Sequence, residues 1–401
     1  MALCGPARPL LAASQGAISR GILVLTLALL AVPSPSLAQW RGAIAVEARA
    51  YDGDGPAGTR SEELGLVAQG IASWDWDRGR QRLAVEAFLR IDPLESARNR
   101  FDLRELNWSM AWDRWVLSAG FREVFWGVAE SRHVIDEINQ RDPVASLQTY
   151  EKLGQPMVSA GAFLDWGSIE VLFLPIFRPR SFRGRSGQLW SHLPVDEDLY
   201  ELEAGSGRFH PDVAARWSHA FGSWDIGATF FRGLARDPRF ETRLVGADSV
   251  WAPVYELADR VGIDAQWTTR MWALRVEAAT QGSSDRRFLG MAGGVEFAPV
   301  DFASLILEYS FDSRGAEATT SYENDVYAGA RLISQEGSYQ AGFFLDHRSG
   351  TVVFAAEIGR RLGDFATITL DGRGFWGDEA DEPRHARRLD SYVALRLTHY
   401  F

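Results

Sequence analysis

Residues 260–278 read RVGIDAQWTTRMWALRVEA, and the alternation in this stretch decides the fold. Before the polar pair Thr269-Arg270, every second residue from 261 to 267 is apolar, and the residues between them are polar or glycine. After the pair, the alternation resumes with Trp272, Leu274 and Val276 on the apolar face. A period of two predicts two antiparallel strands joined by a tight turn, each with one apolar and one polar face.

The same alternation runs along most of the chain, and the connections between its segments alternate in length. Tight turns are expected at 77–80, 113–114, 167–168, 222–223, 269–270, 299–301, 335–337 and 362–364. Longer polar connections are expected at about 52–62, 92–100, 127–156, 178–210, 233–255, 281–286, 312–323, 347–350 and 377–388. Eight turns and nine longer connections predict eighteen strands, with sixteen as the alternative count. Both chain ends then fall on the side of the tight turns. In β-barrels of bacterial outer membranes, the tight turns lie on the periplasmic side.

Large aromatic residues stand beside the tight turns. Amphipathic rings prefer the boundary between water and lipid, so their positions suggest that the turns lie at such a boundary. They include Trp74, Trp76, Trp112, Trp115, Trp166, Phe221, Trp224, Trp267, Trp272, Phe297 and Phe302. Segments this short satisfy their backbone hydrogen bonds in lipid only within a closed barrel. The predicted fold is all-β: a transmembrane, antiparallel, up-and-down β-barrel. A stack of β-sandwiches is the alternative, but it gives no reason for rings to gather beside the turns.

Residues 1–38 are expected to be a secretory signal peptide that is cleaved before Gln39, which leaves a single barrel over 39–401. Arg8 and Arg20 precede an apolar core at 21–32. This core is shorter than the ~20 residues that a membrane anchor needs. The only cysteine, Cys4, lies in this segment. The exported part is therefore expected to hold together without disulfides.

Composition and motifs argue against several classes of function. The chain has 42 basic and 53 acidic residues, a net charge of −11, whereas nucleic-acid binders carry basic stripes. It contains no HExxH, no CxxC and no phosphate-binding glycine loop. We therefore expect no nucleic-acid partner, no catalytic residues, no metal site and no cofactor. An outer-membrane lipase built from residues distant in sequence is the third-ranked alternative.

The polar faces of the strands carry arginine and carboxylate residues. Guanidinium groups suit either a cross-strand ladder that stiffens the wall or a polar track for an anionic solute, and both roles stay open. In the long connection 127–156, Val134, Ile135 and Ile138 lie at helical spacing, which favours a short helix or turn folded into the barrel; packing on the rim is the alternative. The candidate pore-lining and constriction residues are Arg49, Glu86, Arg90, Arg122, Glu130, Arg132, His133, Asp136, Glu137, Arg141, Arg260, Asp264, Arg275 and Glu277.

The last alternating segment ends on an aromatic residue and places Val393, Leu395, Leu397 and Phe401 on one face. This pattern resembles the recognition signal of Gram-negative outer-membrane proteins that the barrel-assembly machinery reads. The resemblance implies location in the cell outer membrane, with that machinery, membrane lipid and lipopolysaccharide as partners. It leaves the oligomeric state open.

A second resemblance covers about 120–180. Gly120-Phe121-Arg122, Phe125-Trp126-Gly127, Glu130-Ser131, Asp136 and Ile138-Asn139 are similar to a motif of a poorly characterised group of proteobacterial outer-membrane barrels. In that group a strand of the type Gly-Arg-x-x-x-x-Trp-Gly-Glu-Ser leads into an Asn-Pro segment. Here Val128-Ala129 precedes Glu130, and Gln140 stands where proline is common. The stretch LPIFRP at 174–179 is similar to a second signature of the group. The strand count distantly resembles that of the alginate-export porins, and both likenesses imply a porin-like barrel.

Together these patterns favour an outer-membrane, porin-like channel for passive diffusion of small polar or amphipathic solutes. The constriction would be formed by 127–156. The alternative is a barrel plugged by its own loops that binds or scaffolds a periplasmic or surface partner. The identity of the solute does not follow from the residues.

Overall fold

The computed structural model describes residues 38–52, 61–144, 151–182, 193–283, 286–315, 318, 323–377 and 391–401. The expected signal peptide lies outside the described residues apart from Ala38, as does most of the connection 377–388. Residues 145–150 of the long connection 127–156 lie outside them as well. Trp40–Phe401 forms one compact unit, and the fold below is that of this unit.

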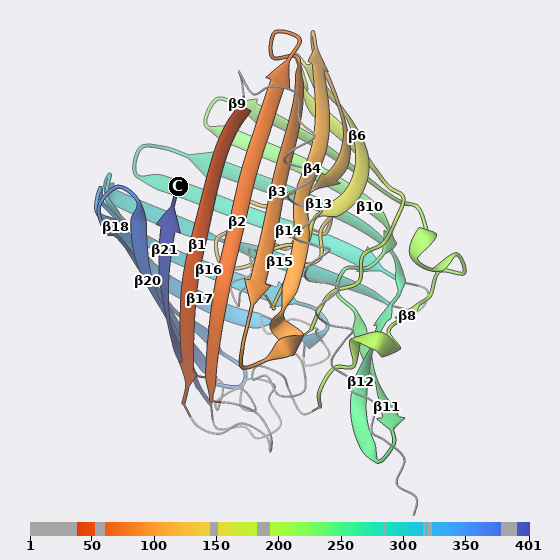
Figure 1. The fold of residues 1–401 in the computed structure, drawn as a ribbon. Coiled ribbons are helices and arrows are strands. Elements are labelled where there is room, and N and C mark those ends of the chain that lie inside the picture. The colour runs from red at the N-terminus through yellow and green to blue at the C-terminus, as the bar shows by residue number, and fades with distance from the viewer. Residues whose placement is uncertain are drawn as a thin grey trace, which may run out of the picture. The chain divides into compact units, whose positions relative to one another are not determined.

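Eighteen antiparallel strands form one sheet, and the sheet closes because the first strand pairs with the last. Val46 lies opposite Leu397 in this closing pair. Figure 1 shows the wall that results. The strands are β1 (Ala38–Tyr51), β2 (Glu62–Trp76), β3 (Gln81–Ile91), β4 (Arg100–Trp112), β5 (Trp115–Arg122), β6 (Gln155–Leu164), β7 (Gly167–Leu174), β9 (Asp212–Phe221), β10 (Trp224–Leu234), β13 (Leu257–Thr268), β14 (Trp272–Gly282), β15 (Arg287–Val300), β16 (Ala303–Asp312), β17 (Asn324–Ile333), β18 (Gly337–Asp346), β19 (Val352–Arg361), β20 (Ala366–Trp376) and β21 (Tyr392–Tyr400).

The alternation of short and long connections is confirmed, and so is the count of eighteen strands rather than sixteen. Each tight turn joins two neighbouring strands at one end of the barrel, and each longer connection joins neighbours at the other end. We call these the short-turn end and the long-connection end. The start of β1 lies beside the end of β21 at the short-turn end, since Ala43 pairs with Tyr400.

The two faces of the wall differ as the alternation predicts. On β14, Leu274 and Val276 face outward and are 43% and 44% exposed, whereas Glu277 faces inward and is fully buried. Leu305 and Leu307 on β16 and Val393, Leu395 and Leu397 on β21 are likewise exposed on the outer face. An apolar outer face around a polar interior is typical of a barrel that crosses a lipid bilayer.

Aromatic side chains gather on the outer face at the short-turn end, as their positions beside the tight turns of the sequence predict. Trp112, Trp115, Trp166, Trp224, Trp272 and Phe302 are exposed there. Some of them contact rings of neighbouring strands, and the tilted rings of Trp272 and Phe297 lie with their centroids 4.4 Å apart. Such a belt places rings at the depth of lipid headgroups.

The connection 233–255 is not the plain loop that its polarity suggested. It forms a hairpin of β11 (Arg239–Val245) and β12 (Asp248–Tyr255), and β12 pairs in parallel with β8 (Glu201–Leu202). The hairpin extends from the long-connection end (Figure 1). Phe177, Leu234 and Tyr255 form an apolar cluster at its base, which accounts for the order of this small sheet.

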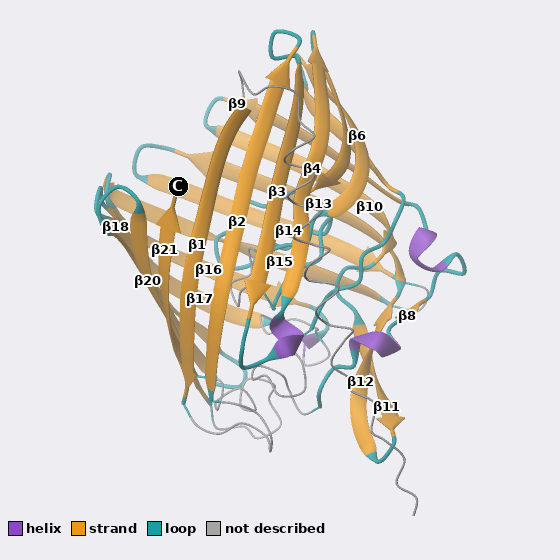
Figure 2. Ribbon diagram, viewed as in Figure 1, coloured by secondary structure: helices purple, strands orange, loops and turns teal. Residues whose placement is uncertain are grey.

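Helical structure in the described part of the chain consists of three 3-10 turns, η1 (Ser96–Arg98), η2 (Glu197–Leu199) and η3 (Gly207–Phe209). Figure 2 shows the wall as strand, with these turns in the connections. Across the same residues, no helix has the length and the apolar character that a membrane span requires.

The outer face gives a direct test of the barrel. Val276→Arg places a charge against lipid, and we expect a loss of ~2–4 kcal/mol in the free energy of unfolding. The measurement is urea unfolding in phospholipid vesicles, followed by tryptophan fluorescence. Val276→Leu, which keeps the face apolar, is the matched control and should unfold at nearly the wild-type urea concentration. Equal stability of the arginine and leucine variants would contradict the assignment of this face to lipid.

Candidate functional site: a loop held inside the barrel

The connection between β5 and β6, residues 123–154, is bound to the inner face of the wall; we call it the inner loop. Its described residues, 123–144 and 151–154, carry no helix, so the helix is wrong where a short helix or turn was expected around Val134, Ile135 and Ile138. The reason lies in the hydrogen bonds. The amides of Val134 and Ile135 donate to a wall carboxylate, not to carbonyl groups of a preceding helical turn. The expectation that this segment folds inward, away from the rim, agrees with these contacts.

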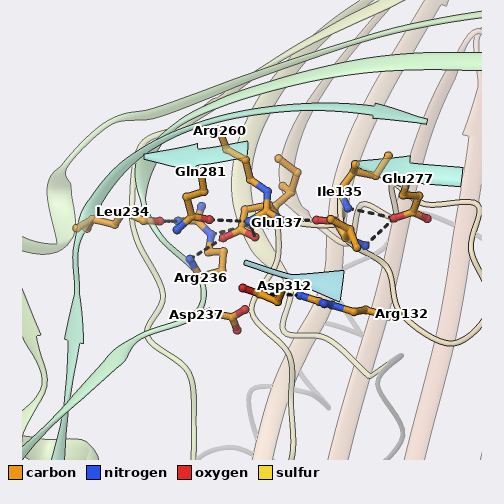
Figure 3. Close-up of polar contacts among 12 residues, drawn as sticks. Arg132, Ile135, Glu137, Leu234, Arg236, Asp237, Arg260, Glu277, Gln281 and Asp312 are labelled. Atoms are coloured by element: carbon orange, nitrogen blue, oxygen red, sulfur yellow. Dashed lines mark hydrogen bonds and ion pairs between the residues drawn. The ribbon is translucent and has the colours of Figure 1, made fainter. Parts of the chain in front are cut away.

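Glu277 on β14 is the main anchor of the inner loop. One carboxylate oxygen accepts the backbone amides of Val128 and Ala129 at 2.6 and 2.8 Å. The other oxygen accepts those of Val134 and Ile135 at 2.6 and 3.1 Å (Figure 3). An ionised carboxylate offers about four lone-pair sites, and hydrogen bonds to a charged acceptor are the strong ones. Glu277 therefore fixes two segments of the loop at once.

Further charged groups of the wall extend this anchorage. Glu308 on β16 accepts the amides of Glu130 and Ser131 at 2.8 and 2.7 Å. The Glu130 side chain forms an ion pair with Arg331 on β17. Arg132 reaches Asp312 at the end of β16, at 2.9 Å. The loop thus spans from β14 to β17 along the inner wall.

Arg236 and Arg260 hold the far side of the loop at the long-connection end (Figure 3). Glu137 forms an ion pair with Arg260 at 3.0 Å and accepts the Arg236 amide at 2.9 Å. The Arg236 guanidinium donates to the Ile138 carbonyl at 2.9 Å and to Asp212 at 2.8 Å.

Side chains within the loop add to its backbone hydrogen bonds, which run from Asp142 to Glu151 and from Leu153 to Gln140. The Asn139 amide accepts from the Val124 amide at 2.8 Å and donates to the carbonyls of Arg122 and Leu153 at 2.9 Å. Asp136 pairs with Lys152 at 2.6 Å. These contacts tie the outgoing and returning arms of the loop together.

Apolar residues of the loop pack against apolar residues that face into the barrel. Trp126, Val134, Ile135 and Ile138 are buried in one cluster with Leu172, Leu174, Phe231, Ala279 and Ala292 of the wall. Leaving these side chains exposed inside a polar lumen would cost roughly 1.5–3 kcal/mol for each large one. Burial and the wall carboxylates therefore act together to fix the loop.

Glycines in the resembling motif serve this arrangement. Gly120 has a φ of +139°, and a Cβ there would overlap the carbonyl of Leu106 on β4. Gly127 lies where a Cβ would crowd Glu277 and His133, just before the two amides that reach Glu277. The motif therefore has a structural role in leading the chain from the wall to its anchor.

Two cavities lie against the inner wall, and residues of the inner loop line one of them. The cavity toward the short-turn end has a volume of about 310 Å³ and is lined by Ser118, Ser159, Ser168 and Ser218 with Arg122 and Glu170. The cavity toward the long-connection end is smaller, about 40 Å³, and arginine is the commonest residue of its lining. We call them the serine cavity and the arginine cavity.

The short side chains of the serine cavity leave space beside the wall. Ser118 and Ser159 share a hydrogen bond of 2.8 Å, as do Ser168 and Ser218. Arg122 crosses the cavity to Glu170 at 2.6 Å.

A second cluster of charged residues lies on β1, β2 and β3 and in the β3–β4 connection. Arg98 of η1 is fully buried and pairs with Glu63 and with Asp92. Arg90 pairs with Glu47 at 2.8 Å, and Arg49 with Glu63 at 2.9 Å. This cluster holds a second connection, between β3 and β4, against the inner wall at β1, β2 and β3.

The candidate residues do not form one constellation. Arg49 and Arg90 belong to the second cluster, and Glu86 accepts a hydrogen bond from Gln69 nearby on the sheet. Those gathered at the inner loop, or paired on the wall beside it, are Arg122, Glu130, Arg132, His133, Asp136, Glu137, Arg141, Arg260, Asp264, Arg275 and Glu277. Val393, Leu395, Leu397 and Phe401 face outward.

Several residues of the site were not among the candidates. Asp312, Glu308, Asp212, Arg236 and Lys152 were missed because only the tertiary structure brings them to the loop. The only sequence signal for these residues was their position: on the polar face of a predicted strand, or close to the end of one. Among the described residues, no three histidine, cysteine or carboxylate side chains lie close enough together to hold a metal ion.

We expect Glu277→Ala to expose the four amides that it binds. Each buried amide left unpaired costs about 1–3 kcal/mol, so hydrogen exchange at Val128, Ala129, Val134 and Ile135 should accelerate by about tenfold or more. Hydrogen–deuterium exchange with peptide-level or NMR detection measures this.

Glu308→Ala is the matched control, because it should affect Glu130 and Ser131 and leave the Glu277 amides protected. Glu277→Gln keeps one carbonyl acceptor and should restore protection to one of the two amide pairs. Unchanged exchange of all four amides in Glu277→Ala would show that Glu277 does not anchor the loop.

Burial of His133 lowers its pKa to about 4, with the charges of Arg141 and Lys152 acting in the same direction and that of Asp136 against it. In the unfolded chain the pKa is about 6.5. Between these values the unfolded chain binds more protons, so the free energy of unfolding should fall by ~1.4 kcal/mol per pH unit as the pH drops through this window.

The measurement is a series of unfolding curves between pH 7 and pH 4 for the wild type and His133→Phe, which lacks this contribution. NMR titration of the His133 ring gives its pKa directly. A ring that titrates near 6.5 in the folded barrel would contradict the prediction.

No family model and no curated protein matches this chain. Solved structures of engineered variants of the Rhodopseudomonas blastica porin are similar to it, with TM-scores of 0.44, 0.45 and 0.43 and identities of 9%, 10% and 7%. In each case the alignment covers 91% of this chain and 100% of the porin chain. A likeness of this degree carries no argument about solute or activity. The resemblance of 120–180 to a group of proteobacterial barrels stays a prediction.

Proposed function

We propose that this protein is a porin-like channel of the outer membrane that lets small polar or amphipathic solutes diffuse passively. The observation that carries this proposal is the inner loop, held inside a closed barrel, with the arginine cavity against it. A wall with an apolar outside and a charged inside suits a water-filled passage through lipid. A loop fixed across the inside provides the narrowing that selects solutes by size.

Selection would occur in two ways. The inner loop sets the width, and charged pairs along the wall set the electrostatic profile of the passage. Arg275 pairs with Glu296 at 2.6 Å, and Arg216 with Asp264 at 2.8 Å. These pairs neutralise much of the wall charge and stiffen neighbouring strands.

We also propose the partners that this location requires. The outward residues Val393, Leu395, Leu397 and Phe401 would be read by the barrel-assembly machinery after export by the signal peptide. Membrane lipid and lipopolysaccharide would then surround the apolar belt.

A plugged barrel that binds or scaffolds a partner is the second candidate. The apolar cluster under Trp126 and the buried Arg98 cluster favour it, since both fill interior space from different sides. In that case the loops would close the lumen, and the protruding β11–β12 hairpin would be available for contact with a partner.

Single-channel recording in planar bilayers separates the two candidates. We expect discrete openings from the purified barrel, and a larger conductance when residues 128–137 are replaced by a short Gly-Ser linker, because this removes the narrowing. Replacement of 347–350, a connection at the same end of the barrel, is the control and should leave the conductance near its wild-type value.

Heat-modifiable mobility on SDS gels verifies that each variant is folded. A folded wild-type barrel without openings would overturn the channel proposal. Openings that appear only in the linker variant would favour the plugged barrel.

A further inference from the structure

The arginine cavity lies on the face of the inner loop that is turned toward the long-connection end. Its lining combines residues of the loop, such as His133 and Glu137, with residues at the ends of β13, β14 and β15, such as Arg260, Gln281 and Gly290. A solute that enters from this end would meet the cavity before the narrowing at the loop.

Positive groups dominate the lining. Its arginines are Arg132, Arg141, Arg180, Arg236, Arg260 and Arg314, against three carboxylates, Asp136, Glu137 and Asp237. The His133 ring is uncharged at neutral pH, because burial lowers its pKa to about 4. Asp212 and Asp312, outside the lining, pair with Arg236, Arg132 and Arg314, so the six arginines meet five carboxylates. A small positive excess remains at the cavity, whereas the chain as a whole carries a net charge of −11.

Most of these guanidinium groups are already held in place. Arg180 pairs with Asp237 at 2.5 Å, Arg236 with Asp212 at 2.8 Å, and Arg260 with Glu137 at 3.0 Å. A guanidinium has five N–H donors, and carbonyl groups take some of those that the carboxylates leave: Ile138 and Leu234 accept from Arg236, and Val134 accepts from Arg260. Fixed arginines with remaining donors form an ordered binding surface, since the cost of immobilising the side chains has been met on folding.

Arg141 differs from the other arginines of the lining. Within the described part of the chain it has no carboxylate within ion-pair distance, and it is half-buried at the cavity. Its charge acts on His133, Lys152 and Asp237, which places it among the groups around the cavity. Arg141 is therefore the residue whose charge an incoming anion would neutralise.

The size of the cavity limits what it holds. A water molecule needs about 10–15 Å³ of such volume, so about 40 Å³ accommodates roughly three waters, or a group of a few heavy atoms. The head group of an organic anion fits this volume, whereas a whole sugar or amino acid does not. Planar guanidinium groups bind carboxylate and phosphate oxygens in pairs.

We propose that the arginine cavity binds the oxyanion head, carboxylate or phosphate, of small organic acids and makes the channel anion-selective. The selectivity part rests on the proposed channel function; binding at the cavity does not. The inference narrows the solute class from polar solutes in general to anionic ones.

Selectivity is tested by the reversal potential of the folded barrel in planar bilayers under a KCl gradient. We expect a preference for chloride over potassium, and a fall of about fivefold in that preference for Arg141→Gln. Fivefold corresponds to ~1 kcal/mol, the energy of two unit charges about 4 Å apart in water. Arg114→Gln, at an exposed short turn at the opposite end, is the matched control and should retain the wild-type preference.

Binding is tested separately by calorimetric titration of the barrel in detergent micelles with sodium phosphate and with sodium acetate. Saturable heat with either anion, lost in Arg141→Gln and kept in Arg114→Gln, supports the proposal. The anion that binds with the higher affinity identifies the head group. Absence of saturable binding for both anions, together with a preference for potassium, would overturn it.

The two proposals fail in different ways. A barrel that binds phosphate or acetate but gives no openings would refute the channel and keep the cavity. A barrel that opens, prefers potassium and binds neither anion would keep the channel and refute the cavity.

Discussion

The pairing of β1 with β21 is the interaction on which the rest of the structure depends. An open sheet would leave two edges of unpaired amides and carbonyls, and in lipid such groups have no water to bind. The pairing from Ala43–Tyr400 to Tyr51–Tyr392 removes both edges along the full height of the wall. Only after this closure does the sheet have an inside, so the arrangement of every polar group described here follows from it.

Closure creates a second requirement, since an interior that is charged on all sides must be neutralised. The wall meets it partly by cross-strand pairs and partly with the inner loop, whose amides satisfy Glu277 and Glu308. The loop gains the same benefit, because a chain without regular structure has amides that need acceptors. Wall and loop are therefore mutually dependent. The apolar cluster around Trp126 excludes water from their contact.

Much of the fold could be predicted from the sequence, because each strand of an up-and-down barrel pairs with the next wall strand along the chain. Alternation as in 260–278 gives the strands, and the lengths of the connections give their number and the two ends. The inner loop could be expected from its length. Its conformation could not, since Val134 and Ile135 bind a carboxylate more than 140 residues away in the chain. For the same reason Glu277 looked like one more lumen residue, although its partners bury it completely. The hairpin β11–β12 was missed because it lies within one long connection and adds no strand to the wall, although Phe240 and Leu244 stand among charged residues as in a strand.

The wall carboxylates hold the inner loop through main-chain amides at 128–131, 134 and 135. Every amino acid except proline supplies the same amide, so the hydrogen bonds from these six amides to Glu277 and Glu308 do not depend on which side chains the six positions carry. Side chains at these positions can therefore change without loss of these six hydrogen bonds. Proline at any of these six positions would remove a donor, and a lineage of related barrels should avoid it there.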